Sequence, residues 1–214
     1  MSFIYCLLLS LVAVIYLPSC APLYTARLDH YHYTRNASFA DQGHPRIIMP
    51  VYIDRDFSLA DQLAIDDSLQ QWNYALNGYY IFKVIDTHFA MQDDILRLAQ
   101  ANQVLVFLKI DHSNKLFQSI KLPGDRHALA FTIRVGGHII YVVRNDIESE
   151  DDLRRLMMHE EGHTLGAKDI HDEHSLMNWS YIPVYFQCID LRTLEQIAPV
   201  QGLPLEQLNY CTQQ

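Results

Sequence analysis

Two histidines, a glutamate, a glycine and an aspartate lie together in the stretch Leu156 to Asp169, LMMHEEGHTLGAKD. On a helix, His159 and His163 are one turn apart, with β-carbons about 5–6 Å from each other, so both imidazoles can reach one metal ion. Glu160 lies roughly 100° round the helix from His159, where its carboxylate can hold a water molecule bound to that metal. These residue types at this spacing predict a catalytic zinc site rather than a helix with solvated histidines.

A third ligand is expected just beyond the second histidine. Gly166 follows His163 by three residues, and Asp169 follows Gly166 by three more. A helix commonly ends with glycine in the left-handed conformation, which lets the chain turn back so that Asp169 reaches the metal. The competing third ligands on spacing are His171, then His174 and Glu173.

The pattern HExxHxxGxxD, followed by Ser175-Leu176-Met177-Asn178, resembles the metzincin clan of zinc metallopeptidases. In that clan the segment with the methionine, the Met-turn, passes beneath the metal. The aspartate at the last ligand position makes the chain similar to the snapalysin-like members, and its first long helix is similar to that of matrixins. The residues that carry the resemblance are His159, Glu160, His163, Gly166, Asp169 and Met177.

The resemblance implies a zinc-dependent endopeptidase. Zn²⁺ would be bound by His159, His163 and Asp169, and Glu160 would activate the zinc-bound water as general base. Met177 would be a soft apolar floor under the zinc rather than a ligand.

Tyr181 is a candidate donor to the developing oxyanion. Metzincins that use a tyrosine for this role have it two residues beyond the methionine, whereas Tyr181 is four residues beyond Met177, so a packed aromatic is the alternative.

Two other functions of the protein also remain open. One is a catalytically idle binding lipoprotein with the metzincin fold, against which the intact Glu160 argues. The other is a zinc hydrolase of a non-protein amide of the cell envelope.

The composition indicates one acidic domain. The chain has 214 residues, 50% of them hydrophobic, which is enough for a sizeable core. The formal net charge of -9 and the pI of about 5.6 argue against a nucleic-acid partner.

The N-terminal residues are typical of an export signal. No charged side chain occurs in residues 1–19, and the apolar run from Phe3 to Leu17 has the length of a signal-peptide core. Leu17-Pro18-Ser19-Cys20 resembles the bacterial lipobox, whose cysteine is lipidated. We therefore expect a signal peptide over 1–19, a tether over 20–45 and a catalytic domain over 46–214. The domain would be extracytoplasmic and bound to the membrane of a bacterial cell envelope through the lipid, with secretion after ordinary cleavage, or an uncleaved anchor, as alternatives.

Periodicity and capping residues predict an α+β domain. The expected elements are a strand over 46–53 with Pro50 at an edge or bulge, a helix over 58–77 capped by Ser58 and Asp61, a strand over 79–85, a short helix over 93–101, a central buried strand over 103–110, a loop over 111–127, strands over 128–135 and 138–143 joined at Gly136-Gly137, a helix opened by Ser149 and Asp152, and a helix over 190–197. This order is similar to a metzincin N-terminal subdomain. It implies a zincin with a mixed twisted sheet, two long helices of which one carries the site, and a small irregular C-terminal subdomain.

Two further features bear on substrate and stability. A polypeptide substrate would bind as an added strand along the edge strand Ala128 to Arg134.

Cys188 and Cys211 are the only cysteines outside the targeting segment. In an oxidising compartment they could form a disulfide, and buried free thiols are the alternative.

Overall fold

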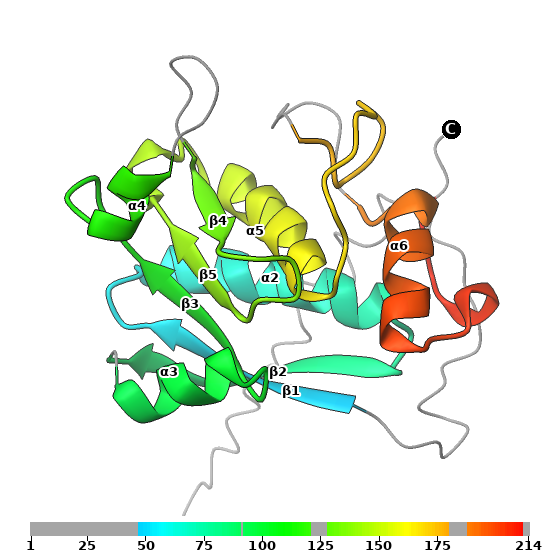
Figure 1. The fold of residues 1–214 in the computed structure, drawn as a ribbon, viewed down its shortest axis with the longest axis horizontal. Helices are drawn as coiled ribbons and strands as arrows, with labels where there is room; N and C mark the ends of the chain where they lie inside the picture. The colour runs from blue at the N-terminus through cyan, green and yellow to red at the C-terminus, as the bar shows by residue number, and fades with distance from the viewer. Residues whose placement is uncertain (1–46, 91, 121–127, 180–187, 212–214) are drawn as a thin grey trace, which may run out of the picture.

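A five-stranded sheet with helices on both faces forms the centre of the molecule (Figure 1). The computed structural model describes residues 47–90, 92–120, 128–179 and 188–211. The strand order is β2-β1-β3-β5-β4. The strands are β1 (Ile47–Asp54), β2 (Tyr80–Phe89), β3 (Leu105–Lys109), β4 (Ala130–Thr132) and β5 (Ile139–Val142). Only β4 runs antiparallel to its neighbour in this sheet, so the expected mixed α+β architecture is confirmed.

The central strand is β3, as its continuous apolar sequence predicts. Residues Leu105 to Leu108 are all buried. Alternate side chains point to opposite faces of the sheet, so Leu105 and Phe107 join one apolar cluster while Val106 and Leu108 join another. Both faces of the parallel part of the sheet are therefore covered.

Of the two expectations for Pro50, the edge position is wrong, because β1 lies between β2 and β3, whereas the bulge agrees with the shift of the β1–β2 register that directly follows Val51. Pro50 pairs with Lys83 of β2, and pairing of β1 with β3 begins only at Val51. Ile47 bonds toward β2 through its N–H, so by alternation the nitrogen of Pro50 faces β3, where no ladder partner has yet begun.

Helices α2 (Leu59–Ala75) and α5 (Glu150–Thr164) pack together on one face of the sheet (Figure 1). Ser58 and Asp61 form the expected capping box at the start of α2, with both hydrogen bonds at 3.1 Å. Ser149 caps α5 by accepting the Asp152 N–H at 3.1 Å. Trp72 is fully buried and donates from its indole N–H to the Met158 carbonyl at 3.0 Å. It therefore anchors α2 against α5.

Shorter helices complete the fold. They are α3 (Asp93–Gln100) on the opposite face of the sheet, α4 (Lys115–Ser119), α6 (Leu191–Gln201) and the 3-10 turns η2 (Arg144–Asp146) and η3 (Leu205–Gln207). The expected loop over 111–127 is thus wrong in part. Asn114 caps α4 by accepting the N–H groups of Leu116 and Phe117, which gives this short helix its start.

The tight hairpin expected at Gly136-Gly137 is also wrong. Strand β4 ends at Thr132 and β5 begins only at Ile139. The turn is centred one residue earlier, because the Gly137 N–H donates to the Arg134 carbonyl at 2.8 Å and Gly136 has φ 74°. The Gly136 N–H donates to the His163 carbonyl at 2.7 Å. This hydrogen bond fixes the segment between β4 and β5 to the end of α5, so the two strands are not joined by a two-residue hairpin.

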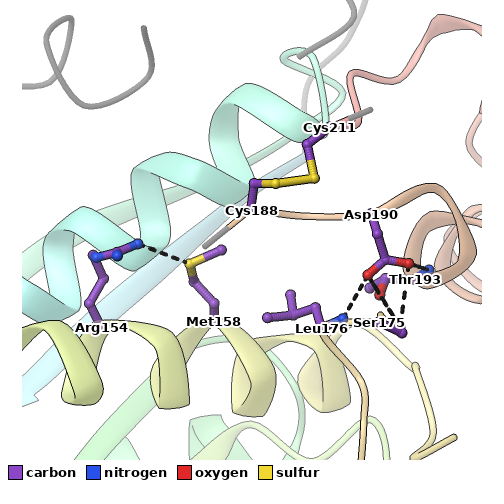
Figure 2. The surroundings of a disulfide bond; sticks show 8 residues. All are labelled: Arg154, Met158, Ser175, Leu176, Cys188, Asp190, Thr193 and Cys211. Carbon is purple, nitrogen blue, oxygen red and sulfur yellow. Dashed lines mark hydrogen bonds between the residues drawn. A yellow bond between two sulfur atoms is a disulfide. The ribbon is translucent and has the colours of Figure 1, made fainter. Parts of the chain in front are cut away.

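The C-terminal segment is small and closed by a disulfide. Cys188 and Cys211 are bonded with their α-carbons 6.0 Å apart (Figure 2). Helix α6 begins at the N-cap Asp190, as expected, and ends at Gly202 in the left-handed conformation.

None of the helices in the described residues has both the length and the apolar character needed to cross a membrane. Cys20 and the targeting segment lie outside the described residues.

Candidate metal centre

The site is built at the C-terminal end of α5, where Gly166 reverses the chain. The Ala167 N–H donates to the Gly162 carbonyl at 2.9 Å and the Gly166 N–H to the His163 carbonyl at 3.1 Å, which is the Schellman pattern. Gly166 has φ 106°, and a β-carbon there would lie 2.7 Å from a methyl carbon of Val200. Both the conformation and the packing therefore require glycine at this position.

Backbone carbonyls orient both histidine rings. The Nδ1 of His159 lies 2.8 Å from the Leu176 carbonyl oxygen, and the Nδ1 of His163 lies 2.9 Å from the Ala167 carbonyl oxygen. In a neutral ring, Nδ1 then carries the proton and donates it, so that Nε2 presents its lone pair. The two rings stand nearly perpendicular, with centroids 4.8 Å apart. This arrangement is suited to two imidazole ligands of one metal ion.

Asp169 faces both histidines. Its Oδ1 lies 3.3 Å from the Nε2 of His159 and 3.4 Å from the Nε2 of His163. Zinc binds such nitrogen and oxygen atoms at about 2.0–2.2 Å with tetrahedral geometry, and the edges of that tetrahedron are about 3.3–3.5 Å long. The distances from Asp169 Oδ1 to the two Nε2 atoms are therefore those expected between ligands of a single zinc ion.

Glu160 lies beside this triangle with one free oxygen. The ligand-capable atoms of His159, Glu160 and His163 all lie within 4.8 Å of one another. Glu160 is 4% exposed, and within the described structure its buried Oε2 has no hydrogen-bond partner. Burial raises the pKa of Glu160, although the two imidazoles and the Thr132 N–H favour its charged form. Asp169 Oδ1 thus lies 3.3 and 3.4 Å from the two Nε2 atoms, while Glu160 keeps an unpartnered oxygen beside them.

The charges of the site are strongly coupled. Burial alone would lower the pKa of His163, but Asp169, Glu160 and the Ala167 carbonyl together raise it to about 9. When their Nε2 atoms also carry protons, hydrogen bonds from His159 and His163 hold the pKa of Asp169 well below its usual range. His163 thus favours an added positive charge while Asp169 keeps its negative charge, and a divalent cation can take the place of the protons between them.

Met177 packs against α5 between the two histidines of the motif. It is fully buried, and a β-carbon on Gly162 would lie 2.4 Å from its sulfur atom. The Ile170 N–H donates to the Met177 carbonyl at 2.8 Å, and the Trp179 N–H donates to the Ile170 carbonyl at 3.2 Å. The loop from Ile170 to Trp179 thus closes on itself and holds Asp169 near the methionine.

The competing third ligands lie elsewhere. The ring of His171 packs edge-on against Trp179 with centroids 5.5 Å apart. The Nε2 of His174 lies 3.7 Å from the Glu173 carboxylate, and both side chains are exposed. Tyr181 lies outside the described residues. Among the described residues, the cluster at His159 is the one group of three histidine, cysteine or acidic side chains close enough for a metal ion.

Several parts of the site are not evident from the motif. Three of these parts are main-chain groups, which every residue type can supply, so the sequence does not indicate them. They are the carbonyls of Leu176 and Ala167 and the N–H of Thr132. Gly162 does carry a signal. A glycine inside a helix costs roughly 0.5–1 kcal/mol relative to alanine, which points to a close approach at that position.

No protein-family model matches the sequence, and the comparison with curated proteins finds no match. Among solved structures, an archaemetzincin from Methanopyrus kandleri is similar with a TM-score of 0.51 and 13% identity, over 75% of this chain and 98% of that one. The chain therefore shares the fold of this archaemetzincin. A metalloproteinase-II from Bacteroides fragilis aligns with a TM-score of 0.46 and 12% identity, over 83% of this chain and 60% of that one.

Proposed function

We propose that the protein is a zinc-dependent endopeptidase of metzincin type. The observation that carries the proposal is the placement of two imidazole Nε2 atoms at 3.3 and 3.4 Å from one Asp169 oxygen. His159 and His163 are already oriented by backbone carbonyls, so they need no rearrangement to bind a metal ion. The fold shared with the archaemetzincin supports the same conclusion.

The residues of the site divide the chemistry between them. Bound zinc would polarise the scissile carbonyl and lower the pKa of a water ligand. Glu160 then accepts a proton from water at its unpartnered Oε2 and returns it to the departing amine. Its raised pKa makes the carboxylate a stronger base than an exposed glutamate. His159 and His163 keep their protons at Nδ1, where the Leu176 and Ala167 carbonyls accept them.

A polypeptide substrate would bind along β4, which is an edge strand of the described sheet. The Val143 N–H donates to the Leu129 carbonyl at 2.8 Å. In an antiparallel pair the bonding direction alternates, so the main-chain groups of Ala130 and Thr132 face the outer edge. The Thr132 N–H favours the charged form of Glu160, which puts that edge next to the base. An extended peptide added there would lie beside the reacting groups.

The decisive experiment compares the parent with Glu160→Gln for zinc content and for cleavage of an unstructured polypeptide. We expect the variant to keep zinc and to lose cleavage by about 100-fold or more. Glu173→Gln is the matched control, because Glu173 is an exposed glutamate of the neighbouring loop, and it should cleave like the parent. Equal cleavage by Glu160→Gln and parent would defeat the mechanism. A zinc-loaded parent that cleaves cell-envelope amides but no polypeptide would favour that substrate instead.

We also propose that a lipid on Cys20 binds the protein to the outer side of a bacterial membrane. The support is the apolar stretch before Cys20 and its resemblance to the lipobox. Expression in a bacterium with a labelled fatty acid should label the parent and leave Cys20→Ala unlabelled. An unlabelled parent released into the medium would instead indicate ordinary signal cleavage and secretion.

A further inference from the structure

Asp190 is a buried carboxylate at the point where three segments meet. It is 8% exposed and caps α6 by accepting the Thr193 N–H at 3.0 Å and the Thr193 hydroxyl at 2.7 Å. It also accepts the Leu176 N–H at 2.7 Å, and the Ser175 hydroxyl lies 3.2 Å from one of its oxygens (Figure 2). A buried charge is retained only when it is well paired, and here donors from the helix and from the methionine segment supply the pairing.

Leu176 connects Asp190 to a metal-binding histidine. The N–H of Leu176 donates to Asp190, and the carbonyl of the same residue lies 2.8 Å from the Nδ1 of His159. The Met177 N–H donates to the Ser175 hydroxyl at 3.2 Å, so the turn is also braced internally. A movement of the Asp190 carboxylate would therefore displace the carbonyl that sets the ring of His159.

The disulfide lies next to this carboxylate. Cys188 precedes Asp190 by two residues and is bonded to Cys211. The Cys211 N–H donates to the Ile189 carbonyl at 2.9 Å, and Asp190 pairs with Cys211 in a β-bridge. The backbone just before Asp190 is thus fixed by a covalent bond and by main-chain pairing, while the backbone after it is fixed by α6.

We propose that Asp190 is a positioning residue for the metal centre and that the Cys188–Cys211 disulfide holds it in place. This inference rests on the proposed zinc site. Asp190 contacts neither metal nor substrate, and it acts through the Leu176 peptide on the orientation of His159. Groups that orient metal ligands from outside the coordination shell typically change metal affinity by about 10–100-fold when they are altered.

The test uses Asp190→Asn in the full chain. Asparagine keeps the size and can still cap α6 through its one carbonyl oxygen, but its NH₂ group then faces the Leu176 N–H in place of an acceptor. Thr193→Val is the matched control, because it removes a hydrogen bond to Asp190 and leaves the bond to Leu176 intact. We expect zinc affinity, measured by competition with a chromophoric chelator, to fall about 10–100-fold in Asp190→Asn and less than about threefold in the control. Equal affinities in Asp190→Asn and the parent would overturn the proposal.

A second readout needs neither zinc nor activity. Nitrogen NMR of the His159 ring in the metal-free protein, at a pH where the ring is neutral and in an Asp169→Ala background that removes the acceptor 3.3 Å from Nε2, should show the proton on Nδ1 when Asp190 is present. The proton should shift partly to Nε2 in Asp190→Asn, whereas a merely structural role would leave the tautomer unchanged. If the parent binds no zinc, this signal still decides the positioning role separately from the proposed function. If Asp190→Asn does not fold, Ser175→Ala takes its place, with the same expected direction of shift.

The role of the disulfide is tested by the Cys188→Ser/Cys211→Ser double variant. We expect its zinc affinity to fall several-fold, less than in Asp190→Asn, because the capping bonds of α6 remain. Ile65→Val controls for general loss of stability, since this fully buried side chain belongs to α2 and the substitution costs about 0.5–1.5 kcal/mol. Parent-like affinity in the double variant would refute the supporting role of the disulfide.

Discussion

Gly162 and Met177 pack so closely that the missing β-carbon of the glycine would lie 2.4 Å from the methionine sulfur. The methionine therefore lies directly against α5, within the turn that separates the two histidines. Met177 is fully buried, and its neighbour Leu176 carries the carbonyl that orients His159. The contact couples the packing of the helix to the geometry of the metal centre.

We expect Gly162→Ala to destabilise the protein. At an ordinary helix position the change would stabilise by roughly 0.5–1 kcal/mol, but here the added methyl group must displace Met177, and overpacking costs about 1–3 kcal/mol. The net loss should be about 1–2 kcal/mol in urea unfolding. Zinc affinity should fall as well, because the displaced turn carries the Leu176 carbonyl.

Met177→Ala provides the control for this contact. In that background the added methyl group no longer meets the sulfur, so Gly162→Ala should become neutral or stabilising. A double-mutant cycle measures the coupling directly. The same cost in both backgrounds would show that the close approach does not limit residue 162.

Glu161 is expected to keep its proton to a higher pH than an exposed glutamate does. Its side chain is fully buried between α5 and α2, with Oε1 2.6 Å from the Ser68 hydroxyl. The same hydroxyl lies 2.6 Å from the Ile65 carbonyl, and its single proton can serve only one of the two acceptors. Burial raises the pKa of Glu161 well above its ordinary value, and the nearby Asp66 raises it further.

This carboxyl should make stability depend on pH. Because its folded-state pKa is raised, its contribution is fully present below the unfolded pKa of about 4.3 and is lost as the pH rises toward the folded pKa. In that window the folded protein binds more protons, so the free energy of unfolding falls by up to about 1.4 kcal/mol per pH unit. Glu161→Gln should lack this contribution. Urea unfolding with a chelator at several pH values checks this, and parallel curves for variant and parent would contradict it.

Local signals in the sequence predict the helix starts and the first part of the site. The capping box at Ser58 and the N-cap at Ser149 each use a partner three positions further on, so both partners are visible in the sequence. His159, Glu160 and His163 share one helix, and their proximity needs no tertiary information. The burial of β3 is equally evident from its continuous apolar run.

Long-range main-chain contacts are what the sequence does not reveal. The turn at Gly136 differs from a tight hairpin because the carbonyl of His163, distant in the chain, accepts its N–H. Pro50 is tolerated inside the sheet because the pairing of β3 begins one residue later. The hydrogen bond from the Leu176 N–H to Asp190 depends on how the C-terminal segment packs. A cap residue alone would not indicate that link.

The third ligand can be identified by paired substitutions. Asp169→Ala should weaken zinc binding by about 100-fold, because structural zinc sites gain about 10–16 kcal/mol from four ligands, or roughly 3 kcal/mol for each. His171→Ala should bind zinc like the parent, since its ring contacts Trp179 rather than the site. Zinc titration of both variants checks the assignment. The reverse ranking would move the third ligand to His171.

Asp169→His tests how the ligand tunes the metal. An aspartate gives the metal more negative charge than a histidine does, so bound zinc should be a weaker Lewis acid in the parent. We expect the acidic limb of the activity profile to move to lower pH in the variant. Identical pH profiles of kcat/KM would show that the charge of this ligand does not set the reaction.

The ion pair between Arg154 and Asp67 should matter far more than those on the surface. The Nε of Arg154 lies 3.5 Å from Asp67, both residues are buried, and Nη1 contacts the Met158 sulfur at 3.6 Å (Figure 2). Removing one partner of a buried pair costs about 3–5 kcal/mol, and without Asp67 the Arg154 guanidinium keeps only the exposed Asp151, at 3.8 Å, among its ion pairs in the described residues. Asp67→Ala should therefore reduce the free energy of unfolding by that amount in urea. Asp94→Ala breaks the exposed pair with Arg97 and should cost less than about 1 kcal/mol. Equal losses in the two variants would mean that water reaches Arg154 despite its burial.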